Sequence, residues 1–296
     1  MVEAKIHTLL TVISTGSFTE AAKMLSLTQP AVSNHIRQLE QSYGIKIFYK
    51  SKKKLLLTPE GAVLEKYARR AVAVAAAARQ AILDRQKNIR HLSVAITPTV
   101  GEHLVPQVMA AYCGRHQDVH MHIQTAGLKD IHDLLRTFEV DLAVIEGELS
   151  DDSLISVLLD TDYLCLIAPA DHPFAGRASV RLEELQGERF ILRSKGAGTR
   201  KLFESYLLGN FHTIQDYNVM IEMDNVATIK ELVEQGLGVS VIGHSACIQE
   251  QRKGKLAVLP IENASMVRKV NMVYRKDFAH PEVAEELREL YNGYVV

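Results

Sequence analysis

One long run of helix-forming residues, from about Pro59 to Asn88, divides this chain of 296 residues into three segments. Apolar and small side chains recur along it at alternating steps of three and four residues, the spacing of an a/d seam between paired helices. The seam residues are Leu64, Tyr67, Ala71, Val74, Ala78 and Ala81. A helix packed inside a single domain shows the same stripe. The spacing therefore predicts a long helix with one contact face, toward a second chain or toward its own domain.

The segments on either side of this helix carry opposite charge. Residues 1–90 contain 15 Lys and Arg against 6 Asp and Glu, a balance of +9, whereas residues 91–296 contain 19 against 29, a balance of −10. Chance clustering of surface charge is one explanation. The other is two modules with different partners, of which the basic one binds a polyanion.

Composition excludes several classes of protein. Apolar residues make up 47% of the chain and charged residues 23%, which is typical of a folded protein. No run of about 18 apolar residues is present, so we expect no membrane span. The first residues lack the pattern of a signal peptide, so we expect a cytoplasmic protein. The cysteines Cys113, Cys165 and Cys247 are too far apart for a CxxC metal site or a disulfide framework, and we expect buried thiols.

The first segment shows short helical patterns separated by turn signals. Ala4–Ile13 places its apolar residues on one helical face, and a glycine then interrupts the pattern. Ser17 and Glu20 have the spacing of a capping box, in which the hydroxyl accepts from the Glu20 amide and the carboxylate reaches back. Thr28 is a suitable N-cap for a third helix that tolerates Pro30 in its first turn.

The third predicted helix has an apolar and a polar side at 100° per residue. The apolar side consists of Val32, Ile36 and Leu39. The polar side spans an arc of roughly 140° and consists of Gln29, Pro30, Ser33, Asn34 and Arg37. Amide side chains pair with adenine edges, guanidinium groups with guanine and hydroxyls with either. A short helix, a tight turn and a helix presenting such groups are typical of a helix-turn-helix in the major groove.

A basic segment follows the third helix. The stretches Ile45–Phe48 and Leu55–Thr58 are strand-like. Between them lie Lys50, Lys52, Lys53 and Lys54. Two strands joined by a basic tip indicate a wing whose lysines contact phosphates. A solvated charge run is the alternative, and the neighbouring helix-turn-helix pattern favours the wing.

Three motifs of the first segment occur together: GSFTEAA at Gly16–Ala22, TQPAVS at Thr28–Ser33 and LTPEG at Leu57–Gly61. In this combination, which covers the whole first segment, the chain resembles the LysR-type transcriptional regulators. The resemblance implies a winged helix-turn-helix that binds operator DNA, a long dimerising helix, and a two-lobed α/β effector domain resembling type 2 periplasmic binding proteins. The candidate DNA-binding residues are Ser17, Thr28, Gln29, Pro30, Ser33, Asn34, Arg37, Lys50, Lys52, Lys53 and Lys54.

One position departs from the family pattern. After Ile47 and Phe48 this chain has Tyr49 and Lys50, where the family usually has arginine after the corresponding pair. Lysine keeps the charge but lacks the planar fork of arginine. We therefore expect Lys50 to contact a phosphate rather than a base.

Strand-like runs alternate with helical patterns from Leu92 onward. The runs are residues 92–97, 119–123, 141–147, 163–169, 189–193, 238–243 and 269–275. This alternation predicts α/β layers with substantially parallel sheets. With the resemblance, it divides the chain into a DNA-binding domain at 1–58, a linker helix at 59–90 and an effector domain at 91–296. Within the last, lobe I covers about 91–162 and 267–296, and lobe II about 163–266.

Ligands of open α/β domains bind beyond the carboxyl ends of strands, near helix N-termini. Four segments supply such ends: 97–102, 146–147, 193–200 and 223–225. Their hydroxyls and a charge from Lys195 or Arg200 favour a small ligand with an anionic group, and the resemblance places this site between the lobes. The candidate effector-binding residues are Thr97, Pro98, Thr99, Val100, Glu146, Ser194, Lys195, Gly198, Thr199, Asp224 and Asn225. An ordinary turn, surface or helix-cap role is the alternative for each.

Motifs typical of enzymes are incomplete. Ser194–Lys201 lacks the glycine-lysine-hydroxyl order of a Walker loop. Gly243–Cys247 matches a nucleophile elbow around Ser245, except that a cysteine replaces the last glycine. His120 and His122 share one face of a strand without a third metal ligand at useful spacing. We therefore expect no catalytic residues, no metal and no cofactor.

The sequence thus predicts a cytoplasmic, metabolite-responsive transcription regulator. The expected partners are double-stranded operator DNA, a small and possibly anionic effector, a second copy through the linker helix, and RNA polymerase if the protein is an activator. The family resemblance implies a homotetramer. The alternatives are an enzyme with an accessory nucleic-acid module, a structural nucleoid protein that bends any DNA, and redox sensing by the cysteines as in the peroxide-responsive members of the family.

Overall fold

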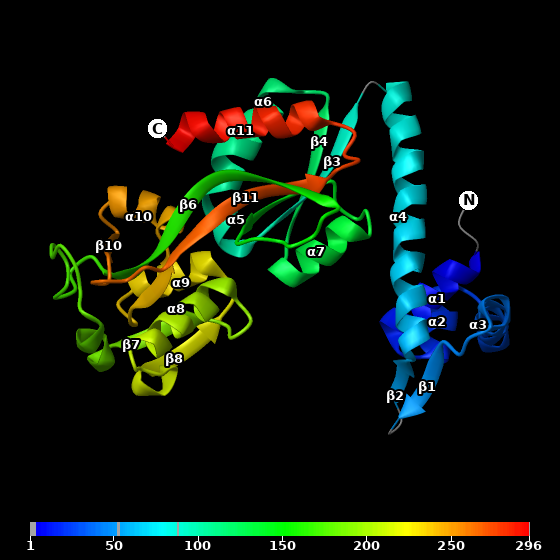
Figure 1. Cartoon of the computed structure of the whole chain (residues 1–296), viewed down its shortest axis with the longest axis horizontal. Coiled ribbons are helices and arrows are strands. Elements are labelled where there is room, and N and C mark those ends of the chain that lie inside the picture. The colour runs from blue at the N-terminus through cyan, green and yellow to red at the C-terminus, as the bar shows by residue number, and fades with distance from the viewer. Residues whose placement is uncertain (1–3, 52–53, 88, 296) are drawn as a thin grey trace. The chain divides into compact units, whose positions relative to one another are not determined.

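The computed structural model describes residues 4–51, 54–87 and 89–295. The chain forms two compact units. Unit 1 comprises Met1–His91 and Arg136–Glu139, and unit 2 comprises Leu92–Leu135 and Val140–Val296. Unit 1 is mainly helical with a small hairpin, whereas unit 2 is a mixed sheet with helices on its faces (Figure 1).

Unit 1 contains four helices and two short strands among its described residues. They are α1 (Ala4–Thr15), α2 (Phe18–Met24), α3 (Gln29–Tyr43), β1 (Phe48–Ser51), β2 (Lys54–Leu57) and α4 (Pro59–Lys87). One apolar core joins them, to which α3 contributes its predicted apolar side of Val32, Ile36 and Leu39. The 29-residue α4 confirms the predicted long helix and packs its first turns on this core through Leu64 and Ala68.

Local side chains begin and end the helices of unit 1. The Ser17 hydroxyl accepts from the Glu20 amide at 3.4 Å, as predicted, but the Glu20 carboxylate accepts from Lys23 Nζ at 2.9 Å rather than reaching back. The Thr28 hydroxyl accepts from the Ala31 amide and begins α3. Gly44 ends α3 in the left-handed conformation, at φ +65°, which glycine adopts without a Cβ penalty.

The hairpin begins three residues later than the predicted strand at Ile45. Two of the intervening amides instead donate to Glu40 near the end of α3. The Ile45 amide donates to the Glu40 carbonyl at 3.1 Å, and the Ile47 amide donates to the Glu40 carboxylate at 2.9 Å. These amides are therefore not available to a strand partner. The two strands pair antiparallel from Phe48 opposite Leu57.

Unit 2 alternates strands and helices as predicted, and most of its elements surround one sheet. Its strands are β3 (Arg90–Ile96), β4 (Val119–Thr125), β5 (Leu142–Glu146), β6 (Leu154–Pro169), β7 (Arg189–Arg193), β8 (Asn218–Met223), β9 (Ser240–Gly243), β10 (Leu256–Leu259) and β11 (Val267–Arg275). Its helices are α5 (Pro98–Leu104), α6 (Ala110–Arg115), α7 (Leu128–Arg136), α8 (Gly198–Gly209), α9 (Val226–Glu234), α10 (Ile248–Arg252) and α11 (Pro281–Val295). Short 3-10 turns at 182–187, 214–216 and 244–246, and a π-helical turn at 105–109, complete it.

The long strand β6 joins two lobes. The sheet has the order β10-β6-β11-β5-β3-β4, and β9 also pairs with β6. From Leu154 to Tyr163 the partner of β6 is β11, and from Leu164 to Pro169 its partners are β9 and β10. Figure 1 shows β6 and β11 running side by side between the two lobes.

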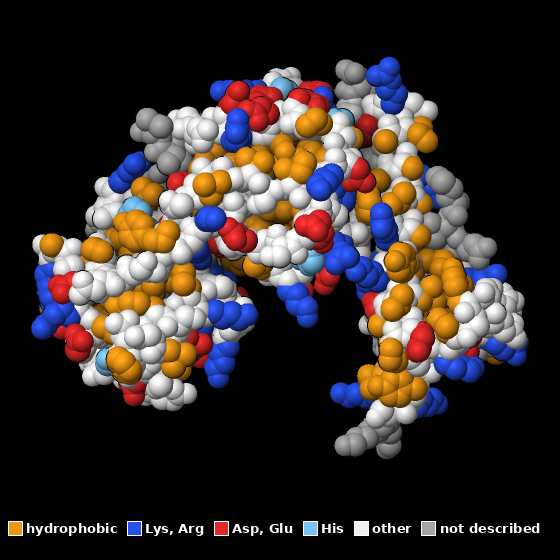
Figure 2. Space-filling model, viewed as in Figure 1, with side chains coloured by type: hydrophobic (Ala, Val, Ile, Leu, Met, Phe, Trp, Pro, Cys, Tyr) orange, Lys and Arg blue, Asp and Glu red, His pale blue; other side chains and the backbone are white. Residues whose placement is uncertain are grey.

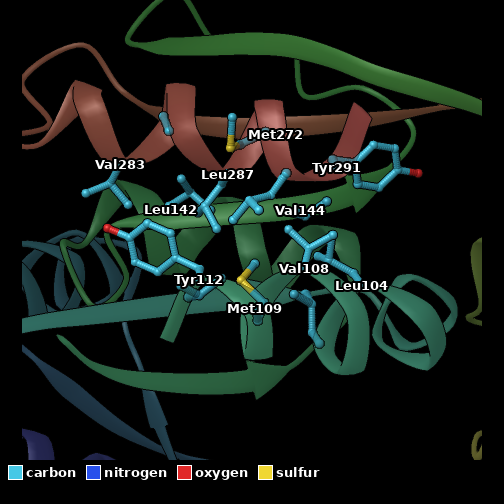
Figure 3. Close-up of a cluster of buried hydrophobic side chains, with 14 of the residues drawn as sticks. Leu104, Val108, Met109, Tyr112, Leu142, Val144, Met272, Val283, Leu287 and Tyr291 are labelled. Atoms are coloured by element: carbon cyan, nitrogen blue, oxygen red, sulfur yellow. The ribbon is translucent and has the colours of Figure 1, made fainter. Parts of the chain in front are cut away.

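Each lobe has its own apolar core. In the first lobe, α11 and the helices after β3 pack on the sheet through Leu104, Tyr112, Met272 and Leu287, which Figure 3 shows meeting between the layers. In the second lobe a separate cluster includes Phe190 and Phe203, whose ring centroids lie 6.2 Å apart. The predicted two-lobed α/β fold is therefore correct.

The prediction of substantially parallel sheets was wrong for the centre of the molecule. The pairs β3–β5 and β7–β8 are parallel, but β11 pairs antiparallel with β5 and β6, and β6 pairs antiparallel with β9 and β10. Two strands that cross between the lobes in opposite directions must pair antiparallel. The sequence analysis also missed β8, β10 and the first half of β6, which are half-exposed and lack long apolar runs.

Candidate DNA-binding surface and effector site

The predicted polar side of α3 faces outward in its first half. Gln29, Pro30 and Arg37 are exposed, and Ser33 and Asn34 are half-buried. The Gln29 amide donates to the Ser33 hydroxyl at 2.9 Å, and the Arg37 guanidinium donates to the Asn34 side chain at 2.8 Å. These contacts keep amide, hydroxyl and guanidinium groups side by side, as direct contact with base edges requires.

The opposite side of α3 is attached to α1. The buried Thr8 hydroxyl lies 2.8 Å from His35 Nδ1, a contact that joins the two helices beside the apolar core. His35 was not singled out in the sequence analysis. No local pattern indicates this pair, because its members lie 27 residues apart.

The hairpin carries exposed lysines beside α2. Lys50 and Lys54 are exposed, and Lys52 and Lys53 lie outside the described residues. Phe18 at the start of α2 packs edge-on against Phe48 of β1 with ring centroids 5.8 Å apart, which fixes the hairpin on the helix that Ser17 caps. Figure 2 shows Lys and Arg side chains on this part of unit 1.

In unit 2, the ends of β3 and β5 bring Thr97, Thr99 and Glu146 together. Both threonine side chains are buried. The Thr97 hydroxyl donates to Glu146 Oε2 at 2.7 Å and accepts from the Glu146 amide at 3.2 Å. Three of the predicted effector-binding residues thus share one wall, although Thr97 and Glu146 lie 49 residues apart in sequence.

Arg268 of β11 lies at the centre of this site and was missed by the sequence analysis. Its guanidinium donates to Asp162 Oδ2 at 3.0 Å and lies 3.0 Å from Glu146 Oε1. Its side chain is 9% exposed, and those of Glu146 and Asp162 are 8% and 5% exposed. Two buried carboxylates around one guanidinium leave this trio with one net negative charge. No local signal could find it, because Arg268 and Asp162 are 106 residues apart.

Residues of the second lobe also contact this cluster. The other end of the Arg268 guanidinium donates to the Thr199 hydroxyl at 3.0 Å, and Ser245 donates its amide and its hydroxyl to Asp162, both at 3.0 Å. Gly243 lies against it so closely that a Cβ there would stand 2.3 Å from both Arg268 and Asp162. This glycine is therefore required by the close approach of side chains, and Ser245 is a structural partner of the site rather than an isolated hydroxyl.

A second buried arginine, Arg193, ends β7 in the same region. It is 4% exposed, and its guanidinium lies 3.9 Å from Asp224, whose carboxylate accepts from the Ser194 hydroxyl. Burial lowers the pKa of Arg193, while the negative charges of Asp224 and Glu146 oppose that shift. An arginine pKa lies so high that the group stays protonated at neutral pH.

Arg200 does not supply a free charge, which corrects the sequence analysis. Its guanidinium donates to Glu204 at 2.6 Å, to Glu222 at 3.2 Å and to the Arg193 carbonyl at 3.2 Å, so its charge is compensated within lobe II. Lys195 is exposed in the loop before α8, and Gly198 is exposed as the first residue of that helix.

The other predicted effector residues have structural partners. Val100 packs in the core of the first lobe, which corrects its assignment as a lining side chain. Pro98 is the first residue of α5. The Asn225 side chain accepts from the Thr228 amide at 2.9 Å and caps α9, as the helix-cap alternative expected.

A cavity of about 480 Å³ in unit 2 lies beside this cluster rather than in it. Lys230 on its wall donates to Glu250 at 2.8 Å, lies 3.0 Å from Glu102 and donates to the Ala246 carbonyl at 2.8 Å. Ser245 lines this cavity and contacts the cluster. The Lys230 ammonium on the wall of this cavity thus has its partners within the protein.

The remaining cysteine and histidine candidates lie apart from the cluster. Cys165 and Cys247 are buried with their sulfurs 3.7 Å apart, and Cys113 is half-buried. His120 and His122 are exposed on β4, at the edge of the sheet. Over the described ranges no group of three or more His, Cys, Asp or Glu is arranged to hold a metal ion, and no helix is long and apolar enough to cross a membrane.

Each of the two units matches a known protein family. Residues 4–62 match the bacterial regulatory helix-turn-helix proteins of the lysR family, and residues 85–294 match the LysR substrate binding domain. The chain belongs to the LysR family of transcriptional regulators. It is a DNA-binding regulator with an effector-binding domain, as the resemblance implied.

Relatives and solved structures share both units. The HTH-type transcriptional regulator CysL of Bacillus subtilis (strain 168) is 27% identical over 270 residues, which is 91% of this chain and 89% of that protein. The full-length LysR family regulator CbnR in complex with its target DNA is similar in fold, with a TM-score of 0.68, 15% identity and 98% coverage of each chain. The regulatory domain of Synechocystis PCC6803 CcmR, solved with 2-PG, matches with a TM-score of 0.60 and 20% identity over 68% of this chain and 97% of that domain.

Proposed function

We propose that this regulator binds one operator sequence through α3 and responds to a small anionic effector bound between the lobes of unit 2. The polar side of α3 carries the proposal: its amide, hydroxyl and guanidinium groups are exposed and paired with one another, while the other side is fixed in the core. Gln29, Ser33, Asn34 and Arg37 contact base edges in this scheme.

Phosphate contacts come from the surroundings of α3. Lys50 and Lys54 are exposed on the hairpin, and Lys52 and Lys53 belong to the same basic tip. Ser17, Thr28 and Pro30 lie at the starts of α2 and α3, where free amides attract phosphate oxygens. These contacts fix the position of the protein on the duplex without selecting a sequence.

Two chains pair through α4 in this scheme. Tyr67 and Val74 of the predicted seam are 62% and 45% exposed, with Val63 and Ile82 exposed beside them, and Figure 2 shows hydrophobic side chains along this helix. Leu64, in contrast, belongs to the core of unit 1. Pairing would place two α3 helices in successive major grooves about 34–36 Å apart, and two such dimers form the proposed homotetramer.

The effector is proposed to bind at the cluster around Arg268. Thr97 and Glu146 of the first lobe and Thr199 of the second are joined through Arg268, and Thr99 lies beside Gly243 next to them. Ser194, Lys195, Gly198 and Asp224 lie at the entrance loop of the second lobe in this scheme. An effector that contacts both lobes changes their equilibrium arrangement and so the placement of the DNA-binding units. The CcmR domain with 2-PG is a fold relative in which a ligand is present.

The remaining proposals concern organisation and context. We assign residues 1–58 to DNA binding, 59–90 to pairing and 91–296 to the effector, with lobe boundaries near 162 and 266. The protein acts in the cytoplasm, catalyses no reaction, and contacts RNA polymerase if it activates transcription.

Fluorescence anisotropy tests the DNA-binding part. The full chain is titrated with the DNA upstream of its own gene and with a scrambled fragment of equal length, over a series of salt concentrations. Sequence-specific binding predicts tighter binding to the native fragment that persists at higher salt. Equal and steeply salt-dependent binding to both fragments means that phosphate contacts dominate, as expected of a structural nucleoid protein, and would contradict the proposal for this DNA.

A double substitution tests the effector part. With Thr99 and Thr199 both changed to valine, we expect unchanged affinity for DNA but no response of the protein–DNA complex to small carboxylates and phosphates that alter the wild-type complex. An unchanged response in the double variant would place the effector elsewhere.

A further inference from the structure

Buried polar atoms without partners are concentrated at the proposed effector site. Six side-chain nitrogen or oxygen atoms of the described residues are buried without a hydrogen bond, and three of them are Glu146 Oε1, Arg193 Nε and Arg268 Nε. A buried polar atom without a partner costs free energy, so such atoms call for a specific explanation. Their grouping around one cluster suggests a ligand that supplies the missing partners.

Arg193 is the clearest case. Its side chain is 5% exposed, yet among the described residues its guanidinium donates no hydrogen bond, and its nearest carboxylate oxygen, on Asp224, is 3.9 Å away. Arg200, seven residues later and equally buried, donates three. The contrast separates an arginine whose guanidinium is hydrogen-bonded within the protein from one whose guanidinium, among the described residues, is not.

The other two atoms define the second half of the site. The Arg268 guanidinium has two carboxylates within 3.0 Å, so its charge is more than neutralised. Glu146 Oε2 accepts from Thr97, whereas Glu146 Oε1 lies near Arg268 without a hydrogen bond. The site thus has a buried cation at Arg193 and a buried acceptor oxygen at Glu146, neither of which is hydrogen-bonded to another described residue.

We propose that the effector is a small anion that also carries a hydrogen-bond donor, a hydroxyl or an ammonium group, with the anionic group on Arg193 and the donor on Glu146. This inference rests on the proposed effector site and narrows its ligand class. A simple anion without a donor would satisfy Arg193 but leave the Glu146 oxygen buried and unpaired, a mismatch that strongly reduces affinity.

The first test compares two neighbouring arginines in the absence of any effector. Because Arg193 is a buried charge that donates no hydrogen bond among the described residues, Arg193→Met is expected to raise the melting temperature of the full chain by about 2–4 °C. Arg200→Met removes three hydrogen bonds and leaves Glu204 and Glu222 without a cation, so it is expected to lower the melting temperature. A comparable fall for both variants would show that Arg193 is structural and would overturn its assignment.

Inorganic sulfate then tests anion binding. Sulfate stabilises most proteins weakly by exclusion from their surface, and the difference between wild type and Arg193→Met removes that common effect. We expect a larger rise of the melting temperature with sulfate than with chloride at equal ionic strength in the wild type, and no such excess in Arg193→Met. Equal responses of the two proteins would overturn the anion-binding role of Arg193.

Matched pairs of acids test the donor. The panel is glycolate with acetate, lactate with propionate, and malate and aspartate with succinate, measured as shifts in melting temperature and as apparent affinities. At least one hydroxy or amino acid is expected to bind about tenfold or more tightly than its parent, and Glu146→Gln, which keeps the size of the side chain, is expected to remove the preference for the ammonium member. Equal shifts within every pair, or no shift with any acid, would overturn the proposed ligand class.

The two sets of variants distinguish failure of the proposed ligand class from failure of the proposed effector site. If Thr99→Val with Thr199→Val removes a ligand response that Arg193→Met retains, the site stands and the charge assignment is wrong. If neither variant alters the response, the proposed effector site itself is wrong.

Discussion

The DNA-binding surface of unit 1 and the effector site of unit 2 use polar side chains in opposite ways. On α3 the polar residues are exposed, and their contacts run between neighbours on one helix, three or four residues apart. Around Arg268 the polar residues are buried, and their contacts join residues between 49 positions (Thr97 and Glu146) and 122 positions (Glu146 and Arg268) apart. The first site is thus a property of one helix, whereas the second exists only in the folded unit.

This difference has an energetic consequence. An exposed side chain of α3 contributes little to folding, so its loss affects mainly DNA binding. A buried charge in unit 2 is balanced by other buried charges, so removing one partner leaves the others uncompensated. Substitutions should therefore separate function from stability in unit 1 and couple them in unit 2.

The largest expected effect is at Arg268. Changing it to methionine leaves Glu146 and Asp162 buried without a cation, and removing one partner of a buried ion pair costs about 3–5 kcal/mol. We expect the free energy of unfolding of unit 2 to fall by this amount, so that its urea transition moves to lower concentration. The transition of unit 1 should stay in place. Circular dichroism and tyrosine fluorescence of the full chain follow the transitions.

A matched control uses an exposed pair. Lys255 lies 2.9 Å from Glu234, and both side chains are largely in solvent. Lys255→Met is expected to leave the urea transition of unit 2 nearly unchanged, because an exposed ion pair contributes little to stability. A similarly small effect of Arg268→Met would show that the cluster is not a coupled network and would remove the contrast between the two units.

The contrast also explains what the sequence could predict. The caps at Ser17 and Thr28, the two sides of α3 and the length of α4 follow from local spacing, and the structure confirms them. The strand of the hairpin was placed three residues early, because the Ile45 amide donates to the Glu40 carbonyl and the Ile47 amide to the Glu40 carboxylate. Strand propensity contains neither contact.

The effector site was only partly predictable. Strand ends indicated Thr97, Thr99, Glu146 and Thr199, because ligands of α/β folds bind beyond such ends. Asp162 lies in the middle of β6 and Arg268 is the second residue of β11, and neither has a glycine, turn signal or helix start beside it in the sequence. Lys195 or Arg200 was expected to supply the charge at this loop, and only the structure shows that Arg200 is hydrogen-bonded within the protein whereas the buried Arg193 Nε is not.

The next largest effect is on DNA recognition. Gln29→Ala with Ser33→Ala removes two of the groups proposed to contact base edges, and each good base contact contributes roughly 1–3 kcal/mol of discrimination. We expect roughly a tenfold or greater loss of affinity for the operator, little change on scrambled DNA and little change in stability. Competition anisotropy measures the two affinities.

Gln41→Ala is the matched control for this double variant. Gln41 is exposed on the last turns of α3, away from the N-terminal half that carries the proposed contacts. It should leave both affinities unchanged. Equal losses on operator and scrambled DNA for the double variant would instead assign Gln29 and Ser33 to phosphate contacts.

The smallest expected effect is a pH dependence in unit 2. Burial by itself lowers the pKa of Lys230, but its hydrogen bonds to Glu250 and Glu102 outweigh this and raise the pKa above its ordinary value. A lysine with a raised pKa stabilises the folded state fully below its unfolded pKa of about 10.4, and this contribution is lost as the pH rises through the folded pKa.

Urea unfolding above and below pH 10 measures this effect. Above about pH 10.4, the free energy of unfolding of the wild type should fall more steeply with pH than that of Lys230→Met. The difference in slope should correspond to at most about one proton bound by the folded state and not by the unfolded state. Tyrosine ionisation is common to both proteins and cancels in the difference. Parallel curves would show that Lys230 is not linked to folding.

The most direct test of sequence-specific DNA binding is selection from a random pool of duplex DNA with the full-length protein, followed by sequencing of the bound fraction. The account predicts enrichment of one motif with two half-sites about 10–10.5 base pairs apart, centre to centre, and a loss of base preference within the half-sites for the Gln29→Ala, Ser33→Ala variant. A bound pool with the same composition as the starting pool would contradict it.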